Sequence, residues 1–266
     1  MTGRELLDEL EAQEARLVFD HFDDDVSWAL GVALRDAAQA AAADDAVRAI
    51  LLTAAGDRAF CVGQDLKEHI GLLAADRESG SGGTMRTVRV HYNPIVRALT
   101  GSAKPVVAAV NGVAAGAGFG FALAADYRVV ADTAAFNTSF AGVALTADSG
   151  ISWTLPRVIG PSRATDLLLF PRSISAQEAY ELGIANRLVP AAELRAEAEK
   201  VARALASGPT LAYAALKESV AFGLTHSLEE TLEKEDELQG RAGASEDHTI
   251  AVQAFVNKQK PEYLGR

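Results

Sequence analysis

The first candidate for chemistry is a glycine-rich segment, NGVAAGAGFG at 111–120, which follows the apolar run KPVVAAV. A glycine-rich turn between a strand and a helix can direct free backbone N–H groups at an anion. The glycines at 112, 116, 118 and 120 match neither the G-x-G-x-x-G dinucleotide pattern nor a P-loop. A buried helix that uses glycine and alanine for close packing has the same composition, so both interpretations remain open.

The second candidate is AFCVGQDL at 59–66, an apolar strand end followed by a turn. Gly63 lets the backbone approach a ligand, and Asp65 is placed to cap the helix expected next. Cys61 has no basic neighbour and lies between Phe60 and Val62. We therefore interpret it as a small core residue and not as a nucleophile.

The third candidate is Asp148, in the segment LTADSGISW at 145–153. Its carboxylate either caps the helix expected after it or acts as an acid/base group. The apolar neighbours Leu145, Ile151 and Trp153 would keep the carboxylate dry, as an acid/base role requires. The G-x-S-x-G serine-hydrolase pattern is absent, and no metal site is expected because the five histidines lack metal-ligand spacing.

Composition restricts the partners. The chain has 266 residues and a formal net charge of −11, which argues against a nucleic-acid partner because phosphate binding needs a basic face. No uncharged apolar stretch has the length and composition of a membrane span, so no membrane partner is expected. Cys61 is the only cysteine, so no internal disulfide can form and a cytoplasmic location is predicted.

Strands and helices alternate in the expected elements of the first part of the chain, which predicts an α/β fold. Apolar runs predict strands at 15–20, 47–53, 104–110, 127–131 and 184–189. Helices are expected at 28–43, 85–99, 116–125, 161–170, 175–182, 190–206 and 209–222. The acidic N-terminus is expected to form a helix capped by Thr2 and Glu5, and SGSGG predicts a flexible loop at 74–84.

Four segments in this order resemble the enoyl-CoA hydratase/isomerase (crotonase) family over residues 44–266. They are LTAAGDRAFCVGQDL at 52–66, KPVVAAVNGVAAGAGFGFALAADYR at 104–128, ISAQEAYELGIANRLVP at 174–190 and FVNKQKPEYLGR at 255–266. The resemblance implies a crotonase-like spiral of β-β-α turns over residues 1–200, with an atypical N-terminus at 1–30. It also implies a helical C-terminal oligomerisation region at 201–266 and assembly as a homotrimer or a dimer of trimers.

The resemblance further implies an acyl-CoA substrate, with coenzyme A as part of the substrate and no separate cofactor. The thioester oxygen would accept hydrogen bonds from the backbone N–H groups of Val62 and Ala117, which stabilise an enolate. Phe255 and Lys258 align with the helix end that contacts the nucleotide end of coenzyme A. The other residues implied in substrate binding are Cys61, Gly63, Gln64, Asp65, Leu66, Gly116 and Phe140.

The reaction type depends on the acids. Hydratases of this family use two glutamates, and the aligned residues here are Gly120 and Phe140, whereas Asp148 aligns with the single acid of family isomerases. The resemblance thus predicts an isomerase in which Asp148 removes a proton from the acyl chain and returns it two carbons away. The alternatives are a hydratase, a hydrolase or a dehalogenase on the same fold, and a catalytically silent CoA-binding scaffold.

Overall fold

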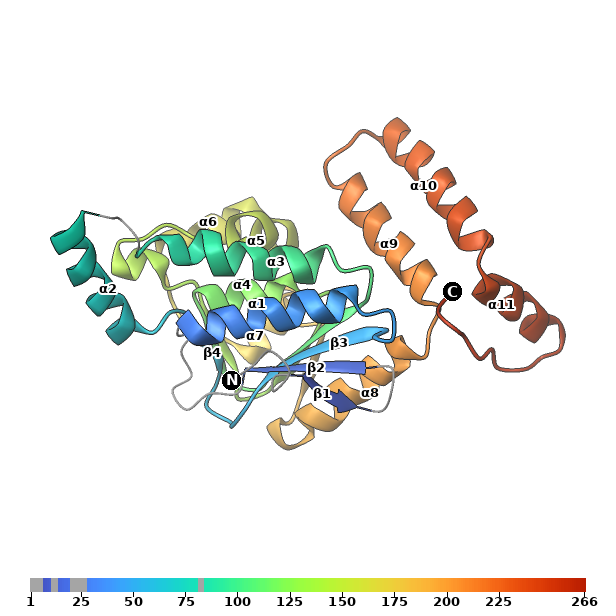
Figure 1. The fold of residues 1–266 in the computed structure, drawn as a ribbon, viewed down its shortest axis with the longest axis horizontal. Coiled ribbons are helices and arrows are strands. Elements are labelled where there is room, and N and C mark those ends of the chain that lie inside the picture. Colours follow the sequence, from blue (N-terminus) through green and yellow to red (C-terminus); the bar gives the residue numbers. More distant parts are fainter. Residues whose placement is uncertain (1–6, 11–13, 20–27, 81–83) are drawn as a thin grey trace.

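The strands form two sheets in the computed structural model, which describes residues 7–10, 14–19, 28–80 and 84–266 (Figure 1). The larger sheet has the order β1-β2-β3-β5-β7-β10 and the smaller one the order β4-β6-β8-β9. The strands are β1 (Leu7–Leu10), β2 (Glu14–Phe19), β3 (Ala49–Ala54), β4 (Ala59–Cys61), β5 (Val106–Val110), β6 (Val113–Ala115), β7 (Tyr127–Ala131), β8 (Ala135–Asn137), β9 (Ile174–Ser175) and β10 (Arg187–Val189).

Helices cover these sheets and dominate the last third of the chain (Figure 1). They are α1 (Trp28–Ala43), α2 (Leu66–Ser79), α3 (Asn93–Thr100), α4 (Ala117–Ala124), α5 (Ile151–Ile159), α6 (Pro161–Leu169), α7 (Ala176–Glu181), α8 (Leu194–Ala206), α9 (Thr210–Gly223), α10 (Leu228–Gly243) and α11 (Glu246–Val256). Three short turns of other helical type are η2 (Val88–Tyr92), η3 (Phe140–Val143) and η4 (Ala191–Glu193).

The chain repeats one structural unit as it advances. In each of the pairs β3–β4, β5–β6 and β7–β8, the first strand joins the larger sheet, the second joins the smaller one, and helical structure follows. Neighbours from β2 to β10 in the larger sheet are parallel, as are β4, β6 and β8 in the smaller one. This arrangement confirms the predicted α/β spiral of β-β-α turns.

Helix α4 lies in the centre of the core. Every one of its residues is buried, as expected for a helix that is apolar on all sides. The ring of Phe119 packs against that of Phe136 with centroids 5.1 Å apart, and Phe121 contacts Tyr92 edge-on at 5.6 Å. The buried run VVAAV of β5 leads to β6 and then to this helix, so the core fixes where α4 begins.

The predicted N-terminal helix is wrong. Residues 7–10 and 14–19 form an antiparallel strand pair, and β2 continues the larger sheet by pairing in parallel with β3 from Glu14↔Ala49 to Phe19↔Ala54. Pairing with a sheet edge satisfies the backbone of this segment and overrides its local helix propensity. The proposed cap residues Thr2 and Glu5 lie outside the described residues.

The predicted loop at 74–84 is also wrong over its first half. Helix α2 continues to Ser79, and the backbone N–H of Gly80, which has φ +67°, then bonds to the carbonyl of Asp76. The sequence AADRES contains good helix formers but no apolar face, and the helix is mostly exposed. Because it lacks hydrophobic periodicity, the sequence pattern did not predict a helix here. The glycines that predicted a loop instead mark where the helix ends.

The last helices form an arm that stands apart from the sheets, whereas α8 packs against β3 and β5 (Figure 1, orange to red). Arg48, at the start of β3, holds the arm by donating to the carbonyl oxygens of Gly208 and Tyr263. The carboxylate of Asp247 accepts the N–H groups of Leu264 and Gly265, which folds the C-terminal tail back onto α11. Within the described part of the chain, no helix is long and apolar enough to cross a membrane.

Candidate active site

Two backbone segments meet at the start of α4. Strand β4 pairs in parallel with β6, so that Cys61 lies opposite Ala114. The turn after β4 is close to α4, because a Cβ atom added to Gly63 would lie 3.6 Å from the backbone nitrogen of Ala117. Gly63 has φ +92°, which suits a residue without a side chain. The structure thus brings together the two segments that the sequence identified as candidate anion sites.

Ala117 is the first residue of α4, and Gly116, with φ +52°, is its N-cap. The backbone N–H groups of a first helical turn have no acceptor within the helix, and the helix dipole makes this end positive. Val62 follows the last residue of β4 and is half-buried beside this turn. Backbone N–H groups held in this way can stabilise negative charge that develops on an oxygen atom.

Glycines allow α4 to approach two other segments closely. A Cβ atom at Gly118 would collide with the carbonyl group of Cys61. One at Gly120 would lie 2.5 Å from the Cβ of Ser149 and 2.6 Å from its carbonyl oxygen. The close-packing interpretation of this glycine pattern is therefore confirmed, and packing at Gly120 fixes the loop that carries Asp148.

Asp148 does not cap the helix that follows it. The N-cap of α5 is Gly150 and receives no side-chain cap bond, while Asp148 contributes only its carbonyl oxygen to the N–H of Ile151 at 3.0 Å. The capping interpretation of its carboxylate is therefore wrong. Within the residues described, the carboxylate has one hydrogen-bond donor, the hydroxyl of Ser149, with 2.8 Å between Oγ and Oδ1.

Burial raises the pKa of the Asp148 carboxyl, and the hydrogen bond from Ser149 lowers it by less. Desolvation penalises the charged form of a carboxyl, and a donor to that form opposes this effect. A carboxyl whose pKa is raised by burial is suited to accept and return a proton.

The expected apolar surroundings of Asp148 are only partly present. Ile151 is fully buried, but Leu145 and Trp153 are 41 % and 46 % exposed. Trp153 lies two residues beyond Ile151 on α5, which turns it to the opposite side of the helix. There its ring stacks with the guanidinium of Arg157, whose Cζ is 4.0 Å from the ring centroid. The expectation that Leu145 and Trp153 shield the acid is thus wrong for the single chain.

Comparison with known proteins identifies the chain. The model of the enoyl-CoA hydratase/isomerase family matches residues 27–266. The chain belongs to the enoyl-CoA hydratase/isomerase (crotonase) family. The match covers both candidate anion segments, the Asp148 loop and the helical arm.

Individual relatives agree with this assignment. The chain is 40 % identical over 245 residues to a Rhodobacter capsulatus protein named "probable enoyl-CoA hydratase", covering 91 % of each chain. It is 39 % identical over 223 residues to the 1,2-epoxyphenylacetyl-CoA isomerase of Escherichia coli, covering 84 % of this chain and 83 % of the other. A crystal structure of a Mycobacterium abscessus protein described as a "putative Enoyl-CoA hydratase/isomerase" superposes with a TM-score of 0.93 at 41 % identity, covering 98 % of this chain and 99 % of the other.

The remaining predicted binding residues of this crotonase-family chain differ in their placement. Cys61 is 2 % exposed, in agreement with its interpretation as a core residue. Asp65 caps α2, because its Oδ1 accepts the N–H of Glu68 at 3.1 Å, and Leu66 is the first residue of that helix. Gln64 directly precedes Asp65, between β4 and α2, and Phe140 is buried in η3.

Phe255 and Lys258 are not brought to the site by the single chain. Phe255 is 85 % exposed on α11, and Lys258 follows that helix with φ +54°. Figure 1 shows α11 at the far end of the arm, well separated from α4 and α5. A role for these two residues beside the candidate site would therefore require another subunit.

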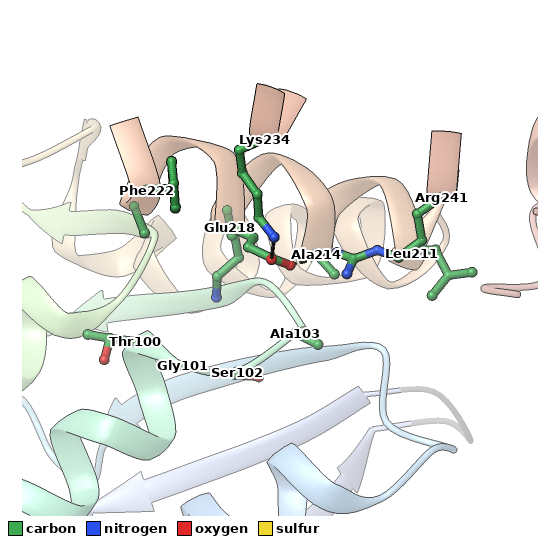
Figure 2. A pocket seen from close by; sticks show the side chains of 12 residues that line it. Thr100, Gly101, Ser102, Ala103, Leu211, Ala214, Glu218, Phe222, Lys234 and Arg241 are labelled. Atoms are coloured by element: carbon green, nitrogen blue, oxygen red, sulfur yellow. Dashed lines mark hydrogen bonds and ion pairs between the residues drawn. The ribbon is translucent and has the colours of Figure 1, made fainter. Parts of the chain in front are cut away.

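A separate pocket of about 750 Å³ lies between the arm and the turn at 100–103 (Figure 2). Its charged side chains are paired with one another or with the core: Glu218 binds Lys234 at 2.7 Å and Arg241 at 2.6 Å, and Lys217 binds Asp126 at 2.6 Å. None of the predicted site residues lines it. We therefore assign this pocket to the attachment of the arm and not to catalysis.

Ser149 is the site residue that sequence reasoning missed. The signal available was a hydroxyl directly beside the candidate acid in the D-S-G turn. Its left-handed backbone, its burial and its bond to Asp148 depend on packing against α4, which no local pattern reports. Among the residues described, no group of three or more His, Cys, Asp or Glu side chains could hold a metal ion.

The contact between Gly120 and Ser149 can be tested by adding a single methyl group. We expect Gly120→Ala to lower the free energy of unfolding by about 1–3 kcal/mol, because overpacking forces the Asp148 loop to move. Gly142→Ala is the matched control, since an added Cβ there meets nothing within 4 Å. Urea unfolding of both variants measures the effect, and equal stability of the two would contradict the contact.

Proposed function

We propose that this protein is an acyl-CoA isomerase that shifts a double bond of an enoyl-CoA, or isomerises a related ring substrate, through a thioester enolate. The backbone N–H groups of Val62 and Ala117 would hold the enolate oxygen. Asp148 would act as the single acid/base group. Coenzyme A would enter as part of the substrate, and no separate cofactor is required by this chemistry.

The observation that carries the proposal is the packing at Gly120. Hydration would need groups that position a water molecule, and family hydratases are expected to use glutamates at the positions of Gly120 and Phe140. Here a side chain at position 120 would overlap Ser149, and Phe140 is apolar and buried. Asp148 is then the carboxylate that would transfer the proton, and a single acid suffices when the proton removed is returned to the same molecule.

The names of the relatives do not decide the reaction. The two relatives of similar identity are named a hydratase and an isomerase. A more distant relative, from Arthrobacter, is named 4-chlorobenzoyl coenzyme A dehalogenase-1 and is 35 % identical over 192 residues. Each of these names refers to a coenzyme A thioester, which supports an acyl-CoA substrate. The features of the site support isomerisation.

The proposed chemistry follows from the geometry of the two segments. Removing a proton beside a thioester places negative charge on the carbonyl oxygen, and fixed N–H dipoles stabilise that charge more in the transition state than in the ground state. Backbone donors need no particular side chain, so valine and alanine can serve. Asp148 would then return the proton two carbons along the chain, leaving the overall composition of the substrate unchanged.

A homotrimer or dimer of trimers would supply what the single chain lacks. The arm exposes large apolar side chains on three helices, including Leu216 at 62 %, Leu228 at 75 % and Phe255 at 85 %. Burying such residues against another subunit is favourable, at about 25 cal/mol per Å² of apolar surface. Assembly would also let Phe255 and Lys258 of one subunit reach the substrate bound to another.

The role of Asp148 can be tested by removing its charge. We expect Asp148→Asn to slow isomerisation of a 3-enoyl-CoA by about 10²–10⁴-fold, because the amide cannot accept the proton. The fold should remain, since α5 does not use this side chain as a cap. Mass-spectrometric product assays and thermal unfolding measure the two effects, with exposed Asp166→Asn as the matched control. Wild-type turnover in Asp148→Asn would refute the mechanism.

The proposed donor at Ala117 can be removed without removing a side-chain contact. Ala117→Pro deletes the N–H at the first helical position, where proline is well tolerated. We expect a loss of about 2.7–4 kcal/mol of transition-state stabilisation, measured as kcat for the same substrate. Ala117→Gly keeps the N–H and serves as the control, and circular dichroism checks that both variants fold. Full turnover in folded Ala117→Pro would exclude this donor.

A further inference from the structure

Ser149 combines three features that its role as a turn residue does not explain. Its backbone has φ +50°, a left-handed conformation that disfavours residues with a Cβ atom. Its side chain is 1 % exposed, against α4 at Gly120. Glycine would adopt this backbone with less strain and would fit the same space. What serine adds is a hydroxyl group, and that hydroxyl donates to Oδ1 of Asp148 at 2.8 Å.

Strain retained at a site is a reason to look for a function that the strained residue supplies. From this geometry we propose that Ser149 is a positioning residue for Asp148, an inference that rests on the proposed isomerisation. By occupying Oδ1, the hydroxyl holds the carboxylate in one orientation. The other oxygen, Oδ2, is then the atom that accepts the proton from the substrate carbon and returns it two carbons away, while the Ser149 proton stays on Oγ.

The hydrogen bond also sets the charge state in which Asp148 rests. A donor to the carboxylate favours its ionised form, which is the form that can accept a proton, against the effect of burial. The pKa of Asp148 is raised by burial and lowered by Ser149. Removing the hydroxyl would therefore raise this pKa further, and the acidic limb of the pH–rate profile would move to higher pH.

Charged groups on the neighbouring elements do not explain the pKa of Asp148. Helix α4 and turn η3 carry no titratable side chain. The charged residues of the neighbouring α3 and α5 are Arg97 and Arg157, and both are exposed. The pKa of Asp148 is shifted by burial and by the Ser149 hydroxyl, so among the described residues this hydroxyl is the one polar group that shifts it.

Two substitutions separate the hydroxyl from the packing. Ser149→Gly removes the hydroxyl and relieves the left-handed backbone, so this variant should fold. Ser149→Ala removes only the hydroxyl and keeps the Cβ beside Gly120. Thr154→Val is the matched control, because it removes a nearby buried hydroxyl that bonds the carbonyl of Gly150 and not Asp148.

The readout that does not depend on turnover is an infrared titration of protein labelled with ¹³C in its aspartate carboxyl groups. The Asp148 band is identified as the one missing from Asp148→Asn. We expect both Ser149 variants to titrate Asp148 at higher pH than the wild type and the Thr154→Val control. We also expect isomerisation to fall by about ten- to hundredfold in both, as for the loss of a hydrogen bond to a charged group.

The outcomes distinguish this inference from the proposed function. If the Asp148 titration is unchanged in Ser149→Gly, the positioning role is refuted whether or not the protein isomerises enoyl-CoA. If the titration moves while the wild-type protein isomerises nothing, the proposed function fails and the control of Asp148 by Ser149 stands. A titration that moves equally in Thr154→Val would assign the effect to general packing and would also overturn the inference.

Discussion

Close contact between α4 and two other segments is the constraint on which the rest of the site depends. The helix can touch the end of β4 because Gly118 has no side chain facing Cys61. It can touch the loop before α5 because Gly120 has none facing Ser149. These two contacts hold the end of β4 and the loop that carries Asp148 against one buried helix, although the three segments come from separate parts of the chain.

The surrounding core keeps this geometry fixed. All residues of α4 are buried, and strand β5, which leads to α4 through β6, belongs to the larger sheet, whose parallel strands β3, β5 and β7 are largely buried. Preorganised dipoles stabilise a developing charge without having to reorient during the reaction, so a rigid Ala117 would favour the proposed chemistry. The arm is built differently, since its apolar side chains are largely exposed and its attachment depends on residues such as Arg48 and Asp247.

Sequence patterns predicted the parts of the fold that are decided locally. The unbroken apolar runs of β5 and α4 indicate buried elements wherever they occur. Strand β2 was predicted at 15–20, but β1 was not, because pairing with β2 decides its conformation and a short acidic segment carries no record of that partner. Helix α2 was missed in part, because an exposed helix without an apolar face shows no periodicity.

For the site, the sequence identified the glycines and Asp148 as candidates but did not show how they are arranged in space. The alternatives for 111–120, close packing and an anion cradle, turn out to be compatible, because the glycines that pack α4 also leave its first N–H groups beside the β4 turn. The sequence does not show which way the Asp148 side chain points, so it could not decide whether this residue caps α5. It also does not fix the rotation of α5, which turns Trp153 outward. Ser149 could be recognised as a site residue only from its backbone angle φ, which the three-dimensional packing sets.

We propose that this site moves a proton within the substrate and does not add water. Incubating the wild-type protein with a 3-enoyl-CoA, and separately with a 2-enoyl-CoA, in water labelled with oxygen-18, followed by mass spectrometry, distinguishes the two reactions. We expect the 3-enoyl-CoA to become its 2-enoyl isomer without gaining oxygen-18, and the 2-enoyl-CoA to gain labelled water poorly. Efficient addition of labelled water to the 2-enoyl-CoA, with no isomerisation of the 3-enoyl-CoA, would contradict it.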